Sequence, residues 1–99
     1  MSEIIVEVDA DIMELIPGFL NNRKKNLVAI EESMEAKDYE AIYQTAHKIK
    51  GSSALYGVAD LSGLAKELEF AGRDKDLKKI EEYFNKMKEY LSQLKIESK

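Results

Sequence analysis

Hydrophobic residues recur three and four positions apart over most of the chain, a spacing typical of helices that pack along one face. The clearest set is Leu77, Ile80, Phe84, Met87, Leu91 and Leu94. With Asp74 or Asp76 as N-cap, it predicts a long helix over about 75–94. A similar set precedes it, formed by Leu61, Leu64, Ala65, Leu68 and Ala71. This set predicts a shorter helix over about 59–71, from which Gly72 would lead out in a left-handed conformation.

Two further helices are predicted in the N-terminal half. Pro17 fits the first turn of a helix, where its missing N–H needs no partner, and this helix is expected to run to about Lys37. Asp38 is typical of an N-cap for the next helix. That helix is expected to reach Tyr56 before Gly57 ends it.

The two ends of the chain lack this spacing. Asp9 or Asp11 can cap a short extra helix of one or two turns before Pro17. The leading segment 2–8 is expected either to lie extended over the end of the bundle or to be loose, and a polar tail follows Leu94. Together the elements predict an all-α fold, an antiparallel four-helix bundle with a short extra N-terminal helix. We expect a single domain over 1–99 with its core at about 11–94.

Composition narrows the classes of function. The 99 residues, 44% of them hydrophobic, suit one folded domain, and a monomer is expected. The net charge of −4 offers no attraction for nucleic acid, and the absence of cysteine excludes thiolate chemistry. Apolar runs of about three residues are far shorter than the roughly 20 that span a bilayer. No signal-peptide pattern is seen, so we expect a cytoplasmic protein without membrane insertion.

The chain has one histidine, His47, which lies in the predicted helix between Asp38 and Gly57. At about 100° per residue, Ala46 and Ile49 fall on the core face of that helix. His47 lies roughly 150° from Ile49 and is therefore expected to face outward. A metal centre is not expected, because Gln44 stands where a Glu-x-x-His pair would need its glutamate and no second histidine exists.

The residues after His47 suggest a nucleophile with free space around it. Gly51 lies one turn on, and a glycine inside a helix costs about 0.5–1 kcal/mol relative to alanine. Either it leaves clearance for an approaching molecule or it permits a tight helix crossing. Lys50, three residues on, can reach an anion held on the ring. Lys48 and Lys50 also favour a neutral imidazole, which keeps a lone pair for attack.

The segment His47–Ser52, with the sequence HKIKGS, is followed by Tyr56-Gly57 and by Leu68-Glu69. This arrangement resembles the H-x-x-K-G-S signature of histidine-containing phosphotransfer (HPt) domains, over about 11–94 of the chain. The resemblance implies a four-helix bundle whose His47 accepts a phosphoryl group from the aspartyl phosphate of a response-regulator receiver domain, or from a histidine-kinase relay. It then passes the group on reversibly. Cofactors are not implied on this chain, because the receiver supplies the magnesium.

The expected docking surface is the helix face around His47. It comprises Tyr43, Gln44, Gly51 and Ala54, completed by residues of the preceding helix. Arg23 either belongs to a solvated face or lines the edge of the histidine site. Glycine loops that cradle nucleotide phosphates are missing, which favours a phosphocarrier over an autokinase or other enzyme. The competing hypothesis is an adaptor bundle that binds receiver domains without phosphotransfer.

Overall fold

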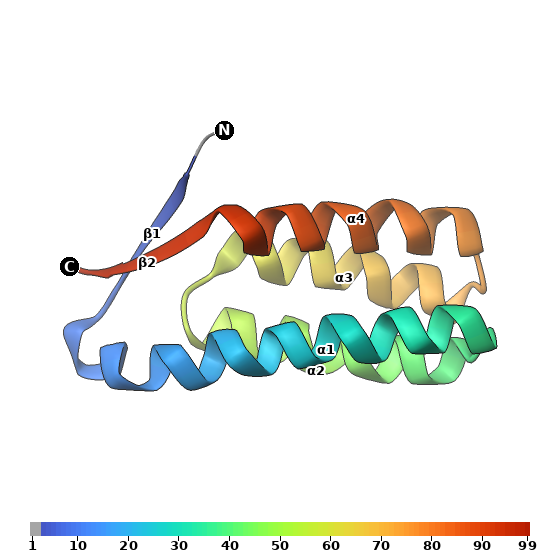
Figure 1. Ribbon diagram of the computed structural model, residues 1–99, viewed down its shortest axis with the longest axis horizontal. Helices are drawn as coiled ribbons and strands as arrows, with labels where there is room; N and C mark the ends of the chain where they lie inside the picture. Colours follow the sequence, from blue (N-terminus) through green and yellow to red (C-terminus); the bar gives the residue numbers. More distant parts are fainter. Residues whose placement is uncertain (1–2) are drawn as a thin grey trace.

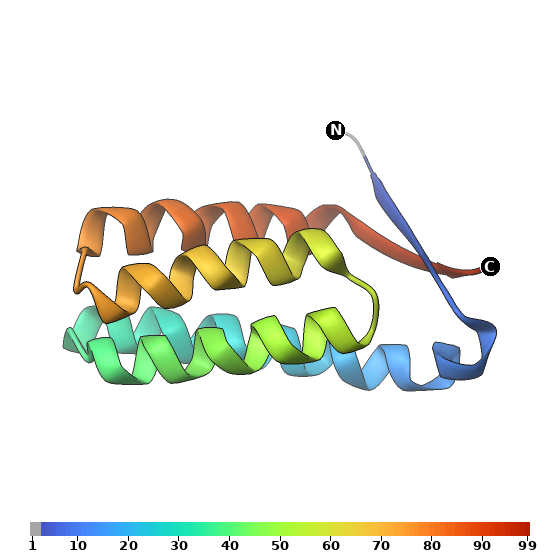
Figure 2. The ribbon, with the colours of Figure 1, turned by 180° about the vertical axis from the view of Figure 1, so that it is seen from behind.

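The computed structural model describes residues 3–99, and four helices dominate it. They are α1 (Ile16–Ala36), α2 (Tyr39–Leu55), α3 (Ala59–Arg73) and α4 (Leu77–Gln93). Short turns connect them, and the chain reverses at each turn, so that the helices lie side by side (Figure 1). Seen from behind, α2 and α3 form one face of the molecule (Figure 2). The four predicted helices are confirmed.

The helix boundaries follow local chemistry. Pro17 lies in the first turn of α1, as predicted. The carboxylates of Asp38 and Asp76 accept hydrogen bonds from the N–H groups of Ala41 and Lys79, at 3.1 and 3.2 Å, and so cap α2 and α4. Gly57 follows α2 with a φ of 81°, in the left-handed region that glycine adopts without strain. These predicted boundaries are confirmed.

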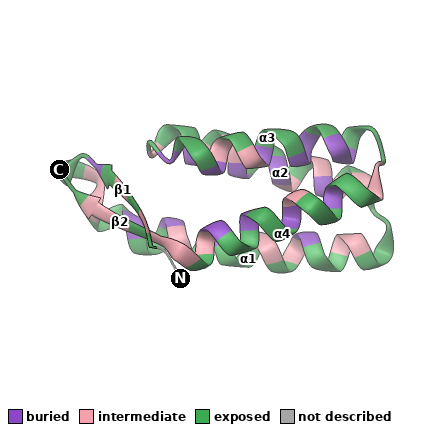
Figure 3. Ribbon diagram, turned by 90° about the horizontal axis from the view of Figure 1, so that it is seen from above, coloured by how far each residue is buried: buried purple, intermediate pink, exposed green. Residues whose placement is uncertain are grey.

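The core lies between the helices and contains most of the residues that the spacing selected (Figure 3). Phe19, Val58 and Tyr90 also belong to it, whereas Leu64, Leu91 and Leu94 are only partly buried. Fully enclosed positions occur on all four helices and include Ile30, Ile42, Ile49, Leu61, Leu68, Ile80 and Met87. The opposite helix faces are exposed (Figure 3). No helix among residues 3–99 combines the length and the apolar character that crossing a membrane requires.

The prediction of an all-α chain is wrong at both ends. Strand β1 (Ile4–Val8) and strand β2 (Leu94–Ser98) pair in parallel, with Ile4 opposite Leu94 and Val8 opposite Ser98. The supposed polar tail is therefore a strand, and residues 4–8 take the extended option, while residue 2 lies outside the described residues. Ile4, Val6 and Val8 are covered and alternate with the exposed Ile5 and Glu7, and this period of two is typical of a strand with one face covered.

The segment before α1 is a 3-10 helix, Ala10–Leu15, that leads directly into α1. Asp9 precedes it without a capping hydrogen bond from its side chain. The short extra helix expected there is thus a tighter 3-10 turn. Ile16, the residue directly before Pro17, adopts the α conformation with φ −64° and ψ −44° and opens α1, so the proline does not separate the two helices.

The prediction that Gly72 ends α3 in a left-handed conformation is wrong. The helix continues to Arg73, and the left-handed residue is Lys75, with a φ of 56°. Gly72 is buried against α2, where an added Cβ would lie 3.1 Å from the backbone nitrogen of Tyr43. Its missing side chain allows α3 to approach α2 closely, and this approach brings α3 beside the helix that carries His47.

Candidate functional site

His47 lies in the middle of α2 and points out of the bundle. Its side chain is 63% exposed, whereas the neighbouring core residues Ala46 and Ile49 are fully buried. The predicted outward orientation is therefore confirmed. A helix fixes the backbone of His47 on both sides, so the imidazole is presented from a rigid support.

A buried glutamate on α3 contacts the imidazole. One oxygen of Glu69, Oε2, lies 2.5 Å from Nδ1 of His47, and the other, Oε1, accepts a hydrogen bond from Nζ of Lys50 at 2.7 Å. Glu69 is only 4% exposed. A carboxylate accepts hydrogen bonds, so Nδ1 carries the proton that it donates to Glu69. In the neutral ring the other nitrogen, Nε2, then keeps the free lone pair.

The charge of Glu69 is maintained by these two partners. Burial alone would raise the pKa of its carboxyl, but the hydrogen bonds and charges of Lys50 and His47 outweigh burial and lower the pKa below its ordinary value. Glu69 is therefore ionised at neutral pH. The site thus joins an exposed imidazole to a fixed negative charge behind it and a cation beside it.

Sequence reasoning gave Glu69 no role, although a signal was present. Glu69 follows Leu68 and lies four residues after Ala65, both of which are fully buried. An acidic residue next to the apolar stripe of a helix needs a partner once the helix is packed. His47 and Lys50 on the neighbouring helix are the partners that the fold supplies.

The structure brings Lys50 to the site and leaves the surface at Gly51 open. Lys50 is one-third exposed and is held on Glu69, so it is already engaged in the resting molecule. An added Cβ at Gly51 would meet nothing within 4 Å. The alternative of a tight helix crossing at Gly51 is therefore wrong, and the space that a clearance role requires is available.

Other predicted site residues lie along the same face of α2. The Tyr43 ring is nearly parallel to the imidazole, with 6.4 Å between ring centroids. Gln44 donates a hydrogen bond to Glu40 at 2.9 Å and, with Tyr43, His47 and Lys48, lines a shallow depression of about 280 Å³. Ala54 is exposed further along the helix. The side chain that contacts His47 from another helix, Glu69, belongs to the following helix and not to the preceding one.

Both alternatives for Arg23 are wrong, because its side chain is buried and not on a solvated face, and it does not line the histidine site. Its guanidinium hydrogen-bonds to Ser52 and to Asn26 and lies over the ring of Phe19, 5.0 Å from the centroid. Ser52 is five residues after His47 and hence about 140° away around α2. Arg23 therefore faces the junction of α1 with α2, whereas His47 faces the junction of α2 with α3.

Residues 3–99 contain no group of three or more histidine, cysteine or acidic side chains placed to hold a metal ion. A family model described as the Hpt domain matches residues 14–97, which include all four helices. The chain belongs to the Hpt domain family. Hpt domains are phosphocarriers in two-component signalling and interact with receiver domains and kinases. No curated protein and no solved structure matches the chain.

Proposed function

We propose that this Hpt domain is a histidine phosphocarrier in a phosphorelay and that His47 is the residue phosphorylated. It accepts the phosphoryl group from the aspartyl phosphate of a receiver domain, or from a kinase relay, and passes it on reversibly. The observation that carries the proposal is the exposed His47 imidazole whose Nδ1 contacts the buried Glu69 at 2.5 Å. That contact fixes the ring in one tautomer.

The nucleophile in this proposal is Nε2 of His47. Its lone pair attacks the phosphorus atom, the N–P bond forms, and the P–O bond to the aspartate breaks, which returns that aspartate to a carboxylate. No proton has to leave Nε2, and the proton on Nδ1 stays in its hydrogen bond with Glu69. The reverse step returns the phosphoryl group to an aspartate by the same path.

Glu69 is the positioning residue for this step. A neutral imidazole that bonds to phosphorus gains positive charge, and the carboxylate on Nδ1 stabilises that charge as it develops. Because the group is already in place and already ionised, little reorganisation is needed during transfer. The lowered pKa of Glu69 supports this role.

Lys50 stabilises the phosphoryl group by donating hydrogen bonds to it. An ammonium has three N–H donors, and the structure assigns one of them to Glu69, at 2.7 Å. The remaining donors can reach a phosphoryl group on a ring three residues away on the same side of the helix. Lys50 therefore stabilises the phosphorylated state more than the resting state.

The remaining site residues form the approach for the receiver. Gly51 leaves room for the incoming aspartyl phosphate, and Tyr43, Gln44 and Ala54 supply contacts around His47 on α2. The receiver brings the Mg²⁺ that its own phosphorylation site requires, so the proposed reaction needs no cofactor on this chain. We assign the whole of 1–99 to one such domain, without ATP-binding or autokinase activity, acting as a monomer.

Incubation with a phosphorylated receiver domain tests the proposal. Label should move to the chain, resist alkali and be lost in acid, as phosphohistidine is, and His47→Ala should abolish it. Transfer to the His47→Ala variant would refute the assignment. Binding of the receiver without any label on His47 at neutral pH would instead establish the adaptor function.

A further inference from the structure

Lys50 is bonded to α3 twice, through its side chain and through its backbone. Its ammonium donates a hydrogen bond to Glu69 at 2.7 Å, and its carbonyl oxygen accepts one from the hydroxyl of Ser62 at 3.0 Å. We propose that Ser62 is a positioning residue for phosphotransfer, whose hydroxyl holds α3 on α2 so that Glu69 stays against His47. The inference rests on the proposed function and adds to it the residue that keeps the site assembled.

Ser62 and Glu69 lie on the same side of α3. They are seven residues apart in the sequence. This is about two helical turns, so the two side chains point within about 20° of each other. A rotation of α3 about its own axis that carries one of them away from α2 therefore carries the other away as well. The hydrogen bond of Ser62 thus opposes the rotation that would separate Glu69 from the imidazole.

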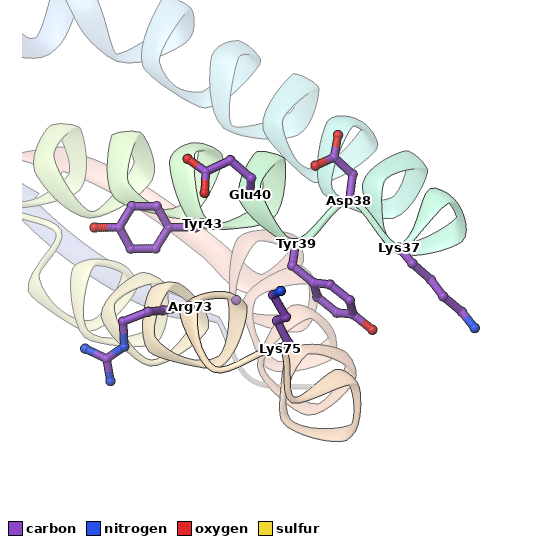
Figure 4. A pocket seen from close by; sticks show the side chains of 8 residues that line it. Lys37, Asp38, Tyr39, Glu40, Tyr43, Arg73 and Lys75 are labelled. Atoms are coloured by element: carbon purple, nitrogen blue, oxygen red, sulfur yellow. The ribbon is translucent and has the colours of Figure 1, made fainter.

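Glu69 lies between two contacts of α3 with α2. On one side is the hydrogen bond of Ser62, and on the other is Gly72, packed on the backbone of Tyr43. At the Gly72 end the two helices run side by side, with Tyr43 on α2 and Arg73 on α3 (Figure 4). Packing limits how closely the helices approach, whereas a hydrogen bond also has a preferred direction. The bond of Ser62 therefore restricts sliding and rotation as well as distance.

The acceptor of the Ser62 hydrogen bond is a backbone atom, which separates it from the movement of the lysine side chain. In the proposed function the Lys50 ammonium donates to the phosphoryl group, and this weakens its attachment to Glu69. The Lys50 carbonyl is part of α2 and stays in place when the side chain turns. A carbonyl oxygen has two lone pairs, which suffice for a helical hydrogen bond and for the hydroxyl. The contact of Ser62 with α2 is thus kept during transfer.

Ser62→Ala tests the proposal kinetically. The rate of transfer from a phosphorylated receiver to His47 should fall about three- to tenfold, because outer groups that orient a reacting residue have effects of about tenfold or more. Labelling by phosphoramidate, a small donor, should fall by the same factor, since the change acts on the imidazole and not on docking. Alanine has a higher helix propensity than serine, which offsets part of the lost hydrogen bond. Circular dichroism should therefore show unchanged helical content.

Nitrogen NMR of His47 provides a readout that a merely structural role of Ser62 would not change. The shifts of the two ring nitrogens report which of them carries the proton in the neutral imidazole. In the unmutated protein the tautomer protonated at Nδ1 should dominate, because Nδ1 donates to Glu69. Ser62→Ala should lower the fraction of this tautomer, since Glu69 is then held less firmly against the ring.

Ser33→Ala is the matched control. Its hydroxyl is also partly buried and also donates to a backbone carbonyl, that of Ala29 at 2.8 Å, but this bond lies within α1. The variant should leave the transfer rate and the tautomer of His47 unchanged. Ser62→Thr keeps the hydroxyl and should retain both. Ser62→Val, which has nearly the shape of threonine without the hydroxyl, should behave like Ser62→Ala.

Equal rates and tautomer fractions for Ser62→Ala and Ser33→Ala would overturn the inference while the phosphocarrier function stands. A lower rate without a change of tautomer, or the reverse, would also overturn it, because Ser62 would then not act through Glu69 and His47. Equal losses for Ser62→Thr and Ser62→Val would exclude the hydroxyl as the cause. Failure of both donors to label His47 in the unmutated protein would overturn the proposed function and, with it, the role of Ser62 in transfer.

Discussion

Two charged side chains are buried among residues 3–99, Glu69 and Arg23, and they differ in the kind of groups that contact them. Glu69, between α2 and α3, is 4% exposed and has a cation and an imidazole as partners. Arg23, between α1 and α2, is 8% exposed and contacts the hydroxyl of Ser52, the amide of Asn26 and the ring of Phe19. The junction of α2 with α3 contains a charge network, whereas the junction of α1 with α2 contains a cation among neutral groups.

The pKa values of both residues are lowered, but this favours the charged form of Glu69 and disfavours the charged form of Arg23. For Glu69, burial would raise the pKa, but Lys50 and His47 outweigh it, so the folded protein favours the ionised carboxylate. For Arg23, desolvation by burial lowers the pKa, so the fold disfavours its charge. A fixed charge that the fold stabilises can assist chemistry. A charge that burial disfavours, such as that of Arg23, contributes through the packing of its side chain.

The largest expected effect is that of Glu69→Gln on phosphotransfer. The substitution keeps the shape but removes the charge that stabilises the phosphorylated ring, so the transfer rate to His47 should fall about 10–100-fold, as for other residues that orient a reacting group. Rapid-quench kinetics with a phosphorylated receiver measures it. Glu67→Gln, at an exposed position of the same helix, is the control. Equal rates for the two variants would show that the Glu69 charge plays no part.

Gly72→Ala should destabilise the folded protein at the junction of α2 with α3, which contains Glu69. The new Cβ meets the Tyr43 backbone nitrogen at 3.1 Å, which cannot yield without moving α2. Overpacking of this kind costs about 1–3 kcal/mol, against a gain in helix propensity of up to about 1 kcal/mol. Urea unfolding should therefore show a net loss for Gly72→Ala. Gly63→Ala, in open space on the same helix, should instead gain stability. A higher free energy of unfolding for both variants would contradict the close packing of α3 on α2.

Lys50→Ala should shift the phosphotransfer equilibrium. The ammonium stabilises the phosphoryl group by about 1 kcal/mol at a partly exposed position, so the phosphorylated fraction of His47 should fall several-fold. Lys48→Ala should do much less, because Lys48 points about 100° away from His47 around α2. Equilibration of both variants with one receiver decides the question. An equal or larger effect of Lys48→Ala would contradict the placement of Lys50.

The stability of the domain should depend on pH through Glu69. Its pKa in the folded state is lowered below the ordinary value of 4.5, so the unfolded state binds more protons in the interval between the two pKa values. The stabilisation is thus complete above about pH 4.5 and is lost as the pH falls through the folded pKa. Urea unfolding at a series of pH values should show that Glu69→Gln loses this part of the dependence. An unchanged dependence would contradict the charge network.

Arg23→Met should have the smallest effect. Methionine keeps an apolar side chain over Phe19, and the Ser52 hydroxyl retains its hydrogen bond to the Lys48 carbonyl at 2.9 Å. Replacing a buried charge by a well-packed apolar group is often neutral or stabilising. The free energy of unfolding should change by less than about 1 kcal/mol, and transfer to His47 should be unaffected. A loss above about 3 kcal/mol, typical of a broken buried pair, would show that Arg23 has a charged partner.

The spacing of apolar residues was sufficient to locate the helices. Ile80, Phe84 and Met87 recur once per turn and are buried together on α4. Local chemistry also fixed several ends, since the caps at Asp38 and Asp76 involve residues only three positions apart. The outward direction of His47 followed from the same periodicity. These features depend on neighbours in the sequence, and a sequence displays them directly.

The sequence by itself thus determined four helices and an exposed His47, whereas the open space at Gly51 was settled by the structure. Only the tertiary structure decided that Glu69 holds His47, that Gly72 is a contact and not a terminus, and that the chain ends pair as strands. The physical reason is distance along the chain. His47 and Glu69 are 22 residues apart, and their contact exists only because α3 packs closely on α2. Helical periodicity specifies which face of a helix is buried, but the partner that meets a given side chain is set by how the helices pack.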